Sequence, residues 1–215
     1  MPRLEAKSLS PAARRLLQTA CRMFAERGVD GVTVREIAEA AGQKNHAAVG
    51  YHFGSKEALI RRLILEGAVL IDGHRNQALD ALEASGRPIT VRDIVEVLIR
   101  SSIELEGSGL EDCYCRFLIT LRSTYHELFM DTLAGRWNSG YQRCLTPLRA
   151  VMPDMPAEVK NERFVFMEVF LGGVLAAREA ALADQSRHHP TWSSDQTLVH
   201  FATAMTAMLE APQPK

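Results

Sequence analysis

Long uncharged apolar runs are missing from this chain. No stretch of about eighteen such residues occurs in its 215 residues, so the sequence predicts no transmembrane helix. The first residues, MPRLEAKSLSPAARR, contain no apolar core segment and do not fit a secretory signal. Hydrophobic residues still make up 47% of the chain and charged residues 24%, so we expect a globular protein with a packed core, located in the cytoplasm.

Sequence signatures of catalysis and metal binding are also missing. The chain has no nucleophile elbow, glycine-rich phosphate loop, HExxH motif or paired-carboxylate motif. Of its four cysteines, Cys113 and Cys115 lie closest together, and their spacing does not match a zinc site. His188 and His189 stand in a polar stretch without an acidic ligand set. We therefore expect reduced thiols, no metal, no cofactor and no enzyme activity, and an all-helical enzyme is a distant alternative.

Helical periodicity, by contrast, extends over nearly the whole chain, and no alternating strand pattern occurs. Serine or threonine caps, glycines and prolines divide it into helices. This pattern predicts an all-α fold of about nine helices. Their expected ranges are 11–27, 33–41, a short one ending at 53, 55–84, 90–106, 111–122, 125–151, 158–183 and 195–209.

The order of parts over residues 32–59, VTVREIAEAAGQKNHAAVGYHFGSKEAL, is typical of a helix-turn-helix. Thr33 and Glu36 fit a capping box that begins one short helix, and Gly42 ends it. A second short helix ends at Phe53, and Ser55 begins a long one. Because this order places one helix in a DNA major groove, we predict a DNA-binding domain over residues 1–54 and a larger helical domain over 55–215.

Charge is divided unevenly between these two parts. Residues 1–62 carry 11 Lys and Arg against 6 Asp and Glu, whereas residues 63–215 carry 14 against 20. A basic N-terminal part joined to an acidic remainder suits a module that faces phosphates.

The same residues resemble the TetR family of bacterial transcriptional regulators. The likeness is dense over residues 20–63, in IAEAAG and AAVGYHFGSKEALI, and the rest matches in length and helical layout. It implies a three-helix DNA-binding module and a C-terminal helical domain that binds a ligand and dimerises. The implied partners are a double-stranded DNA operator, a small-molecule effector and a second copy of the chain. The implied function is a repressor released from a palindromic operator; a ligand-dependent activator and a non-sensing DNA-binding protein remain alternatives.

The resemblance also assigns roles within residues 33–56. It implies phosphate contacts at Thr33 and Lys56 and backbone contacts at Tyr51 and His52. The small residues Ala47 and Gly50 allow close approach to DNA. Between Gly42 and Tyr51 the chain is one residue longer than the usual pattern, which leaves open which residue caps the second helix and which face bases. The candidates are Gln43, Lys44, Asn45 and His46.

For the effector, the resemblance implies a cavity among the C-terminal helices for an apolar or amphipathic molecule. An acyl or aromatic acid derivative would pair with Arg122, although a salt bridge explains this arginine as well, and plain core packing explains each aromatic residue. The candidate lining is Phe117, Arg122, Tyr125, His126, Trp137, Tyr141, Phe166 and Phe170.

A dimer contact is expected on the apolar helix over residues 158–183, together with the last helix. One stripe of this helix is apolar, and Phe166 and Phe170 face elsewhere, so the helix needs cover on more than one side. A wholly intramolecular core helix is the alternative. The expected contact residues are Phe164, Met167, Leu171, Val174, Leu175 and Met205.

Overall fold

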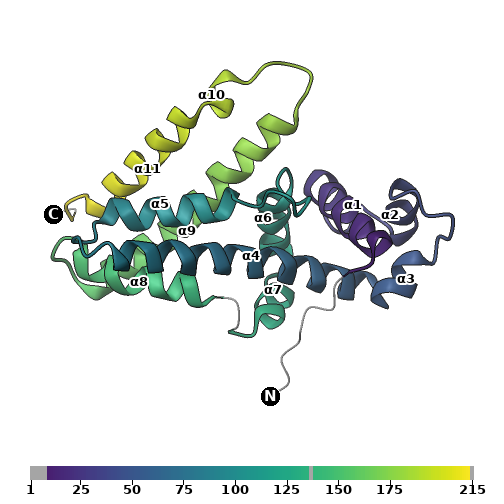
Figure 1. Ribbon diagram of the computed structural model, residues 1–215, viewed down its shortest axis with the longest axis horizontal. Coiled ribbons are helices and arrows are strands. Elements are labelled where there is room, and N and C mark those ends of the chain that lie inside the picture. Colours follow the sequence, from purple (N-terminus) through teal and green to yellow (C-terminus); the bar gives the residue numbers. More distant parts are fainter. Residues whose placement is uncertain (1–8, 136–137, 214–215) are drawn as a thin grey trace.

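The computed structural model describes residues 9–135 and 138–213, and every regular element in these ranges is a helix (Figure 1). The helices are α1 (Pro11–Arg27), α2 (Val34–Ala40), α3 (Ala48–Phe53), α4 (Lys56–Ala84), α5 (Val91–Ile103), α6 (Tyr114–Thr124), α7 (His126–Leu133), α8 (Ser139–Val151), α9 (Ala157–Ala183), α10 (Pro190–Ser193) and α11 (Asp195–Glu210). The all-α prediction is confirmed.

The structure has two more helices, within the described ranges, than the nine expected. The helix expected over 125–151 is divided into α7 and α8, because Ala134 and Gly135 both adopt positive φ angles, 44° and 70°, which end α7. The other addition is α10, a single turn inside the expected polar loop.

The long helix α4 joins two groups of helices (Figure 1). The helices α1, α2 and α3 gather at its N-terminal end and form the part that we call the head. Helices α5 and α8 pack along the other end of α4, and α9 to α11 project away from it. We call helices α5 to α11 the body, and α4 connects the body to the head.

Predicted capping residues begin the helices that position the head. Ser10 accepts a hydrogen bond from the backbone N–H of Ala13 (3.2 Å), and Ser55 caps α4 in the same way. In α2 the Thr33 hydroxyl accepts from the Glu36 N–H (3.2 Å), and the Glu36 carboxylate accepts from the Thr33 N–H (2.8 Å). The capping-box prediction is confirmed.

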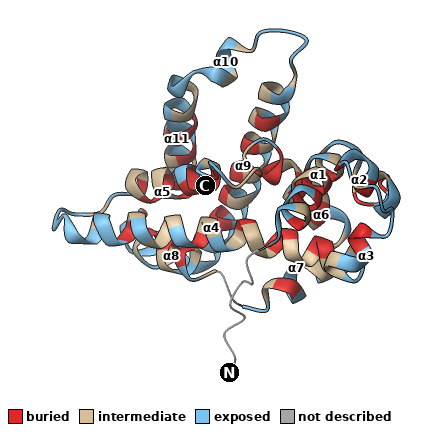
Figure 2. Cartoon of the chain, turned by 45° about the vertical axis from the view of Figure 1, so that its right-hand side comes forward, coloured by how far each residue is buried: buried red, intermediate tan, exposed pale blue. Residues whose placement is uncertain are grey.

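The apolar core forms two clusters, and the buried residues are coloured red along the chain in Figure 2. The first joins the head to α6: Phe24 of α1 and Phe117 of α6 stack with ring centroids 6.1 Å apart. The second lies between the distal part of α4 and helices α5, α8, α9 and α11. Packing therefore continues across residue 54, the expected domain boundary, through α1 and α6.

Two buried charged side chains cap helix ends from a distance. The Glu179 carboxylate of α9 accepts hydrogen bonds from the backbone N–H groups of Cys115 and Arg116, both at 2.9 Å, at the start of α6. Arg163 of α9 donates to the carbonyl of Leu209 (2.7 Å) at the end of α11. These contacts complete the hydrogen bonding that a helix terminus lacks and fix α6 and α11 to α9.

Candidate nucleic-acid interface

The turn before α3 is organised by Asn45. Its side-chain oxygen accepts from the N–H of Ala47 (2.9 Å), and its carbonyl accepts from the N–H of Ala48 (3.0 Å). Gly42, with φ of 69°, ends the preceding turn in the conformation that favours glycine. Asn45 thus closes the turn that precedes α3, while the N-cap position of α3 is Ala47, which makes no side-chain cap hydrogen bond. Lys44 and His46 remain exposed beside Asn45.

Helix α3 has a buried face and an exposed face. Ala48 and Val49 are buried against the head, and Phe53 packs on the same core. Tyr51, in contrast, is 83% exposed, and Gly50 has nothing within 4 Å of the position where a Cβ would stand. An apolar helix face fixed by a core, with an exposed aromatic residue opposite, is the arrangement that a recognition helix needs.

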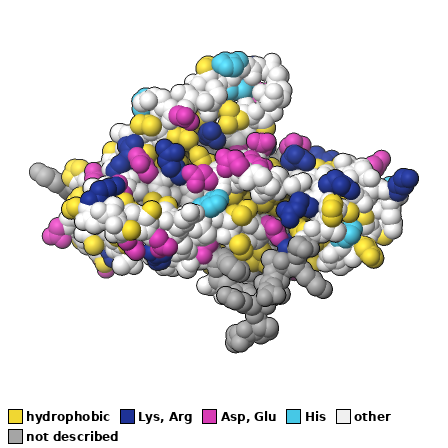
Figure 3. Space-filling view, in the orientation of Figure 1, with side chains coloured by type: hydrophobic (Ala, Val, Ile, Leu, Met, Phe, Trp, Pro, Cys, Tyr) yellow, Lys and Arg dark blue, Asp and Glu magenta, His cyan; other side chains and the backbone are white. Residues whose placement is uncertain are grey.

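Around this exposed face the residues predicted for DNA contact lie close together in the fold. Lys44, Asn45, His46, Ala47 and Gly50 are exposed, whereas Gln43 and His52 are half-buried. The ring of His52 lies edge-on to the Tyr51 ring, with centroids 4.9 Å apart, which limits where the phenol can turn. Figure 3 shows several Lys and Arg side chains on the head end of the molecule.

Thr33 is exposed, but its hydroxyl is already engaged by Glu36. Hydrogen bonds from Thr33, and then from Arg27 at 2.9 Å, lower the pKa of the Glu36 carboxyl from 4.5 to about 2. This carboxyl is therefore ionised at neutral pH. A phosphate contact at Thr33 stays a prediction, and it would have to coexist with this capping box.

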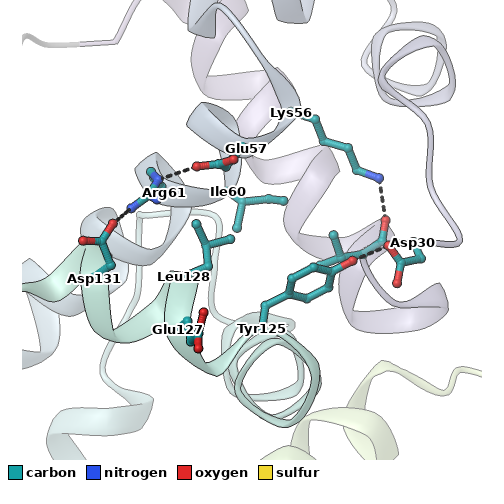
Figure 4. Close-up of a pocket in the computed structure, with 10 residues that line it drawn as sticks. Asp30, Lys56, Glu57, Ile60, Arg61, Tyr125, Glu127, Leu128 and Asp131 are labelled. Atoms are coloured by element: carbon teal, nitrogen blue, oxygen red, sulfur yellow. Dashed lines mark hydrogen bonds and ion pairs between the residues drawn. The ribbon is translucent and has the colours of Figure 1, made fainter.

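Lys56 faces the head as well as solvent. Its Nζ donates to the carbonyl of Val29 (2.6 Å) and lies 5.8 Å from the centre of the Phe24 ring (Figure 4). This lysine therefore ties the start of α4 to the loop between α1 and α2. Its ammonium has three donors, so a phosphate contact stays a prediction for the others.

Lys56 also borders an open groove of about 600 Å³ between the head, α4 and α7 (Figure 4). Across it the Tyr125 hydroxyl donates to Asp30, which raises the pKa of Tyr125 above its usual 10. At its other end Arg61 donates to Asp131 (2.6 Å). Tyr125, expected in an effector cavity, instead links α7 to the head.

The expected effector-lining residues that the structure describes have different surroundings. Phe117 is wholly buried in the core shared with the head. Phe166 and Phe170 of α9 are 57% and 37% exposed, and a role of these three residues in effector binding stays a prediction. His126 is exposed at the start of α7, and Trp137 lies outside the described residues.

Two of the expected lining residues lie near the middle of the body. Arg122 forms an ion pair with Glu168 (2.7 Å), as the alternative reading expected. Tyr141 faces Arg75, whose guanidinium lies 5.7 Å from the ring centre, and burial raises the pKa of Tyr141 to about 12. Sequence reasoning missed Arg75, because an arginine within a long helix reads as a solvated side chain.

Arg75 is half-buried, and its guanidinium bonds to hydroxyls rather than to a carboxylate. Its Nε and Nη2 each donate to a serine hydroxyl of α5, Ser101 and Ser102, both at 3.1 Å. Among the ion pairs of the described residues none includes Arg75. Burial lowers its pKa, because a guanidinium loses hydration there.

The expected dimer stripe covers the protein's own core instead. Its side chains are at most 8% exposed, apart from Val174, which is partly buried on the same cluster, and a dimer contact through this stripe stays a prediction. The buried members are Phe164, Met167, Leu171, Leu175 and Met205. The opposite face of α9 is the open one: Val165, Phe166 and Val169 are 59%, 57% and 69% exposed.

Two other expectations concern metal and membrane. No group of three or more His, Cys, Asp or Glu side chains within the described ranges is placed to hold a metal ion. None of the helices in this described part is long and apolar enough to cross a membrane.

The model of the family of bacterial regulatory proteins called tetR matches residues 16–63, which contain the whole helix-turn-helix. Over these residues the chain is similar to the TetR family. Over 72 residues it is 40% identical to the transcriptional repressor KstR2 of Mycolicibacterium smegmatis, which covers 33% of this chain and 35% of the repressor. Over 53 residues it is 47% identical to the repressor AcnR of Corynebacterium efficiens, covering 25% and 28%. The matches thus span about a third of these TetR repressors.

Solved TetR structures extend the fold likeness over almost the whole chain. A regulatory protein from Rhodococcus RHA1 superposes with a TM-score of 0.62 at 16% identity, covering 95% of this chain and all of that one. AibR, solved with isovaleryl coenzyme A and operator DNA, gives 0.57 at 18%, covering 94% and 100%. At such identities the likeness shows the TetR fold for the body.

Proposed function

We propose that this TetR-like protein is a sequence-specific DNA-binding regulator, and a repressor like its curated relatives. The observation that carries the proposal is α3, a short helix with Val49 in the core and Tyr51 exposed on the opposite face. The hydrogen-bonded turn at Asn45 leads into this helix, and the match over residues 16–63 supports the same role. Double-stranded operator DNA is the proposed partner, so we also propose a cytoplasmic location.

The substitution Tyr51→Ala tests this proposal. Because the side chain is exposed, its loss should leave the thermal midpoint unchanged, whereas operator affinity should fall about tenfold or more. Fluorescence anisotropy with a duplex selected by the wild-type protein measures the affinity. Met130→Ala, at a 54% exposed site on α7, is the matched control. Equal affinity of Tyr51→Ala and wild type would remove α3 from the interface.

We propose a homodimer that uses the exposed face of α9. Three neighbouring apolar side chains there, Val165, Phe166 and Val169, are each more than half exposed. A dimer also supplies two heads, which matters because a single short recognition helix contacts only a few base pairs and a two-fold pair contacts two half-sites. Val169→Asp should give a monomer in sedimentation, with Met130→Asp as the exposed apolar control. A dimeric Val169→Asp protein would contradict this choice of face.

For the effector we propose an acidic or acyl molecule that binds near Arg75. The half-buried guanidinium of Arg75 bonds to two serine hydroxyls and faces the Tyr141 ring, so its charge can pair with an anionic group of an effector. AibR, which shares the fold, was solved with an acyl-coenzyme A. Thermal shifts with isovaleryl coenzyme A and with free fatty acids test the class. Shifts that persist undiminished in Arg75→Met would contradict the site.

A further inference from the structure

Two cysteines from different parts of the molecule stand in contact where the head meets the body. Cys21 belongs to α1 of the head, and Cys113 immediately precedes α6 of the body. The Cys113 thiol points at the Cys21 sulfur, and the two Sγ atoms are 2.8 Å apart. This separation exceeds a disulfide bond by less than about 1 Å, so small side-chain movements suffice to join them.

The other two thiols have different surroundings. Cys115 is held near the carbonyl of Ser102 (3.8 Å) and under the Glu179 cap, and Cys144 lies in the second core cluster. All four cysteines are free and buried. The close approach of sulfurs is therefore specific to the pair that connects α1 with α6.

The segment over residues 104–113 provides access to this pair. It contains two glycines with positive φ, Gly107 (78°) and Gly109 (75°), and it is attached to α1 through a hydrogen bond from Gln18 to the carbonyl of Ser108 (2.8 Å). Such a segment between helices is a place for local opening. Reaction of Cys113 with an oxidant requires this segment to open. Burial raises the pKa of the Cys21 thiol and so favours its protonated form.

We propose that Cys21 and Cys113 form a redox-sensitive disulfide that fixes the head to the body. A hydroperoxide oxidises the Cys113 thiolate to a sulfenic acid and is itself reduced to water or an alcohol. The Cys21 sulfur then attacks the sulfenic sulfur, the S–S bond forms, and the hydroxyl leaves as water after taking up the Cys21 proton. Two thiols are oxidised for each hydroperoxide reduced, and a thiol reductant restores them.

The disulfide has a mechanical consequence. In the reduced protein, α1 and the start of α6 are joined by packing and hydrogen bonds, without a covalent link. A covalent link between them stops the head from turning against α6. Resting on the proposed function, this means that the oxidised protein keeps one head orientation and responds less to an effector.

The experiment uses the full chain and hydrogen peroxide, with the thiols counted after denaturation and the linked peptides found by mass spectrometry. Wild type should fall from four thiols to two, lose the mass of two hydrogens and give a Cys21–Cys113 peptide that dithiothreitol dissolves. Cys21→Ala and Cys113→Ala, each checked for folding by circular dichroism, should form no such link, whereas Cys144→Ala should behave as wild type.

Four thiols remaining after treatment that oxidises free cysteine completely would overturn the proposal, as would a link between any other pair. These readouts need no DNA, so they stand apart from the proposed operator binding. The consequence for the head is tested separately, by comparing DNA affinity of oxidised and reduced wild type with that of Cys113→Ala. Identical affinities before and after oxidation, with and without acyl-coenzyme A, would overturn the mechanical effect.

Discussion

Removal of the Glu179 cap should destabilise the protein through the junction of α6 and α9. In Glu179→Ala the N–H groups of Cys115 and Arg116 lose acceptors at 2.9 Å, at a site where Glu179 is 7% exposed. Each buried donor left without a partner costs about 1–3 kcal/mol. Because removing the carboxylate also ends the cost of burying it, we expect a net loss of about 2–4 kcal/mol.

Urea unfolding at pH 7 measures this loss. With a slope of about 3 kcal/mol per molar, the midpoint should fall by about 1 M. Glu162→Ala, at an exposed site on the same helix, should leave it unchanged. A Glu179→Ala midpoint within about 0.2 M of wild type would refute the assignment, because it would mean that water or another group satisfies both donors.

The difference in stability between wild type and Glu179→Ala should also change with pH in one direction. Burial raises the pKa of Glu179 above its usual 4.5, so the folded state favours the protonated carboxyl. The stability that this group contributes is full below pH 4.5 and is lost as the pH rises through the raised pKa. The gap between wild type and Glu179→Ala should therefore narrow as the pH rises.

Three further predictions concern α4 and the head. Gly67→Ala places a Cβ 2.1 Å from the Tyr114 ring and should lower the free energy of unfolding in urea by about 1–3 kcal/mol. Gly73→Ala, which has open space around it, should raise that free energy by about 0.5–1 kcal/mol. Equal effects of the two substitutions would contradict the packing of Gly67 on Tyr114. Glu36, whose pKa is lowered to about 2, contributes stability above pH 4.5, so the gap between wild type and Glu36→Gln should close as the pH falls from 4.5 to 2. A gap independent of pH would contradict this. Lys56→Ala should lower both the thermal midpoint and the salt dependence of DNA binding. A lower thermal midpoint with an unchanged salt dependence would mean that Lys56 stabilises the fold and does not contact DNA.

Helix caps could be predicted from the sequence, because the residues that form them are close together along the chain. The Thr33–Glu36 box is an example, since a hydroxyl and a carboxylate three residues apart satisfy each other's backbone groups. The break between α7 and α8 was missed, because it depends on a left-handed alanine, Ala134, that no residue type signals. The extra residue before α3 left four polar candidates for the cap, but in the structure the N-cap is Ala47 and Asn45 forms the turn before it.

The site residues of the body were harder to predict, for a different physical reason. Periodicity shows which side chains of α9 share a face, but it does not show what covers that face. Both stripes of α9 are apolar, and the one with Met167 turned out to meet α11 and α5, while that with Val169 remained open. The sequence likewise does not distinguish an aromatic residue that packs in a core from one that lines a cavity, and Phe117 is an example from the core.

Selection of duplexes from a random-sequence library by the purified chain, at physiological salt, tests the central claim most directly. The account predicts a palindromic site whose half-sites lie about 34–36 Å apart, one helical turn or a multiple of it, bound with an affinity that falls steeply as salt rises. Binding without any enriched sequence, or no binding at any salt concentration with and without acyl-coenzyme A, would contradict it.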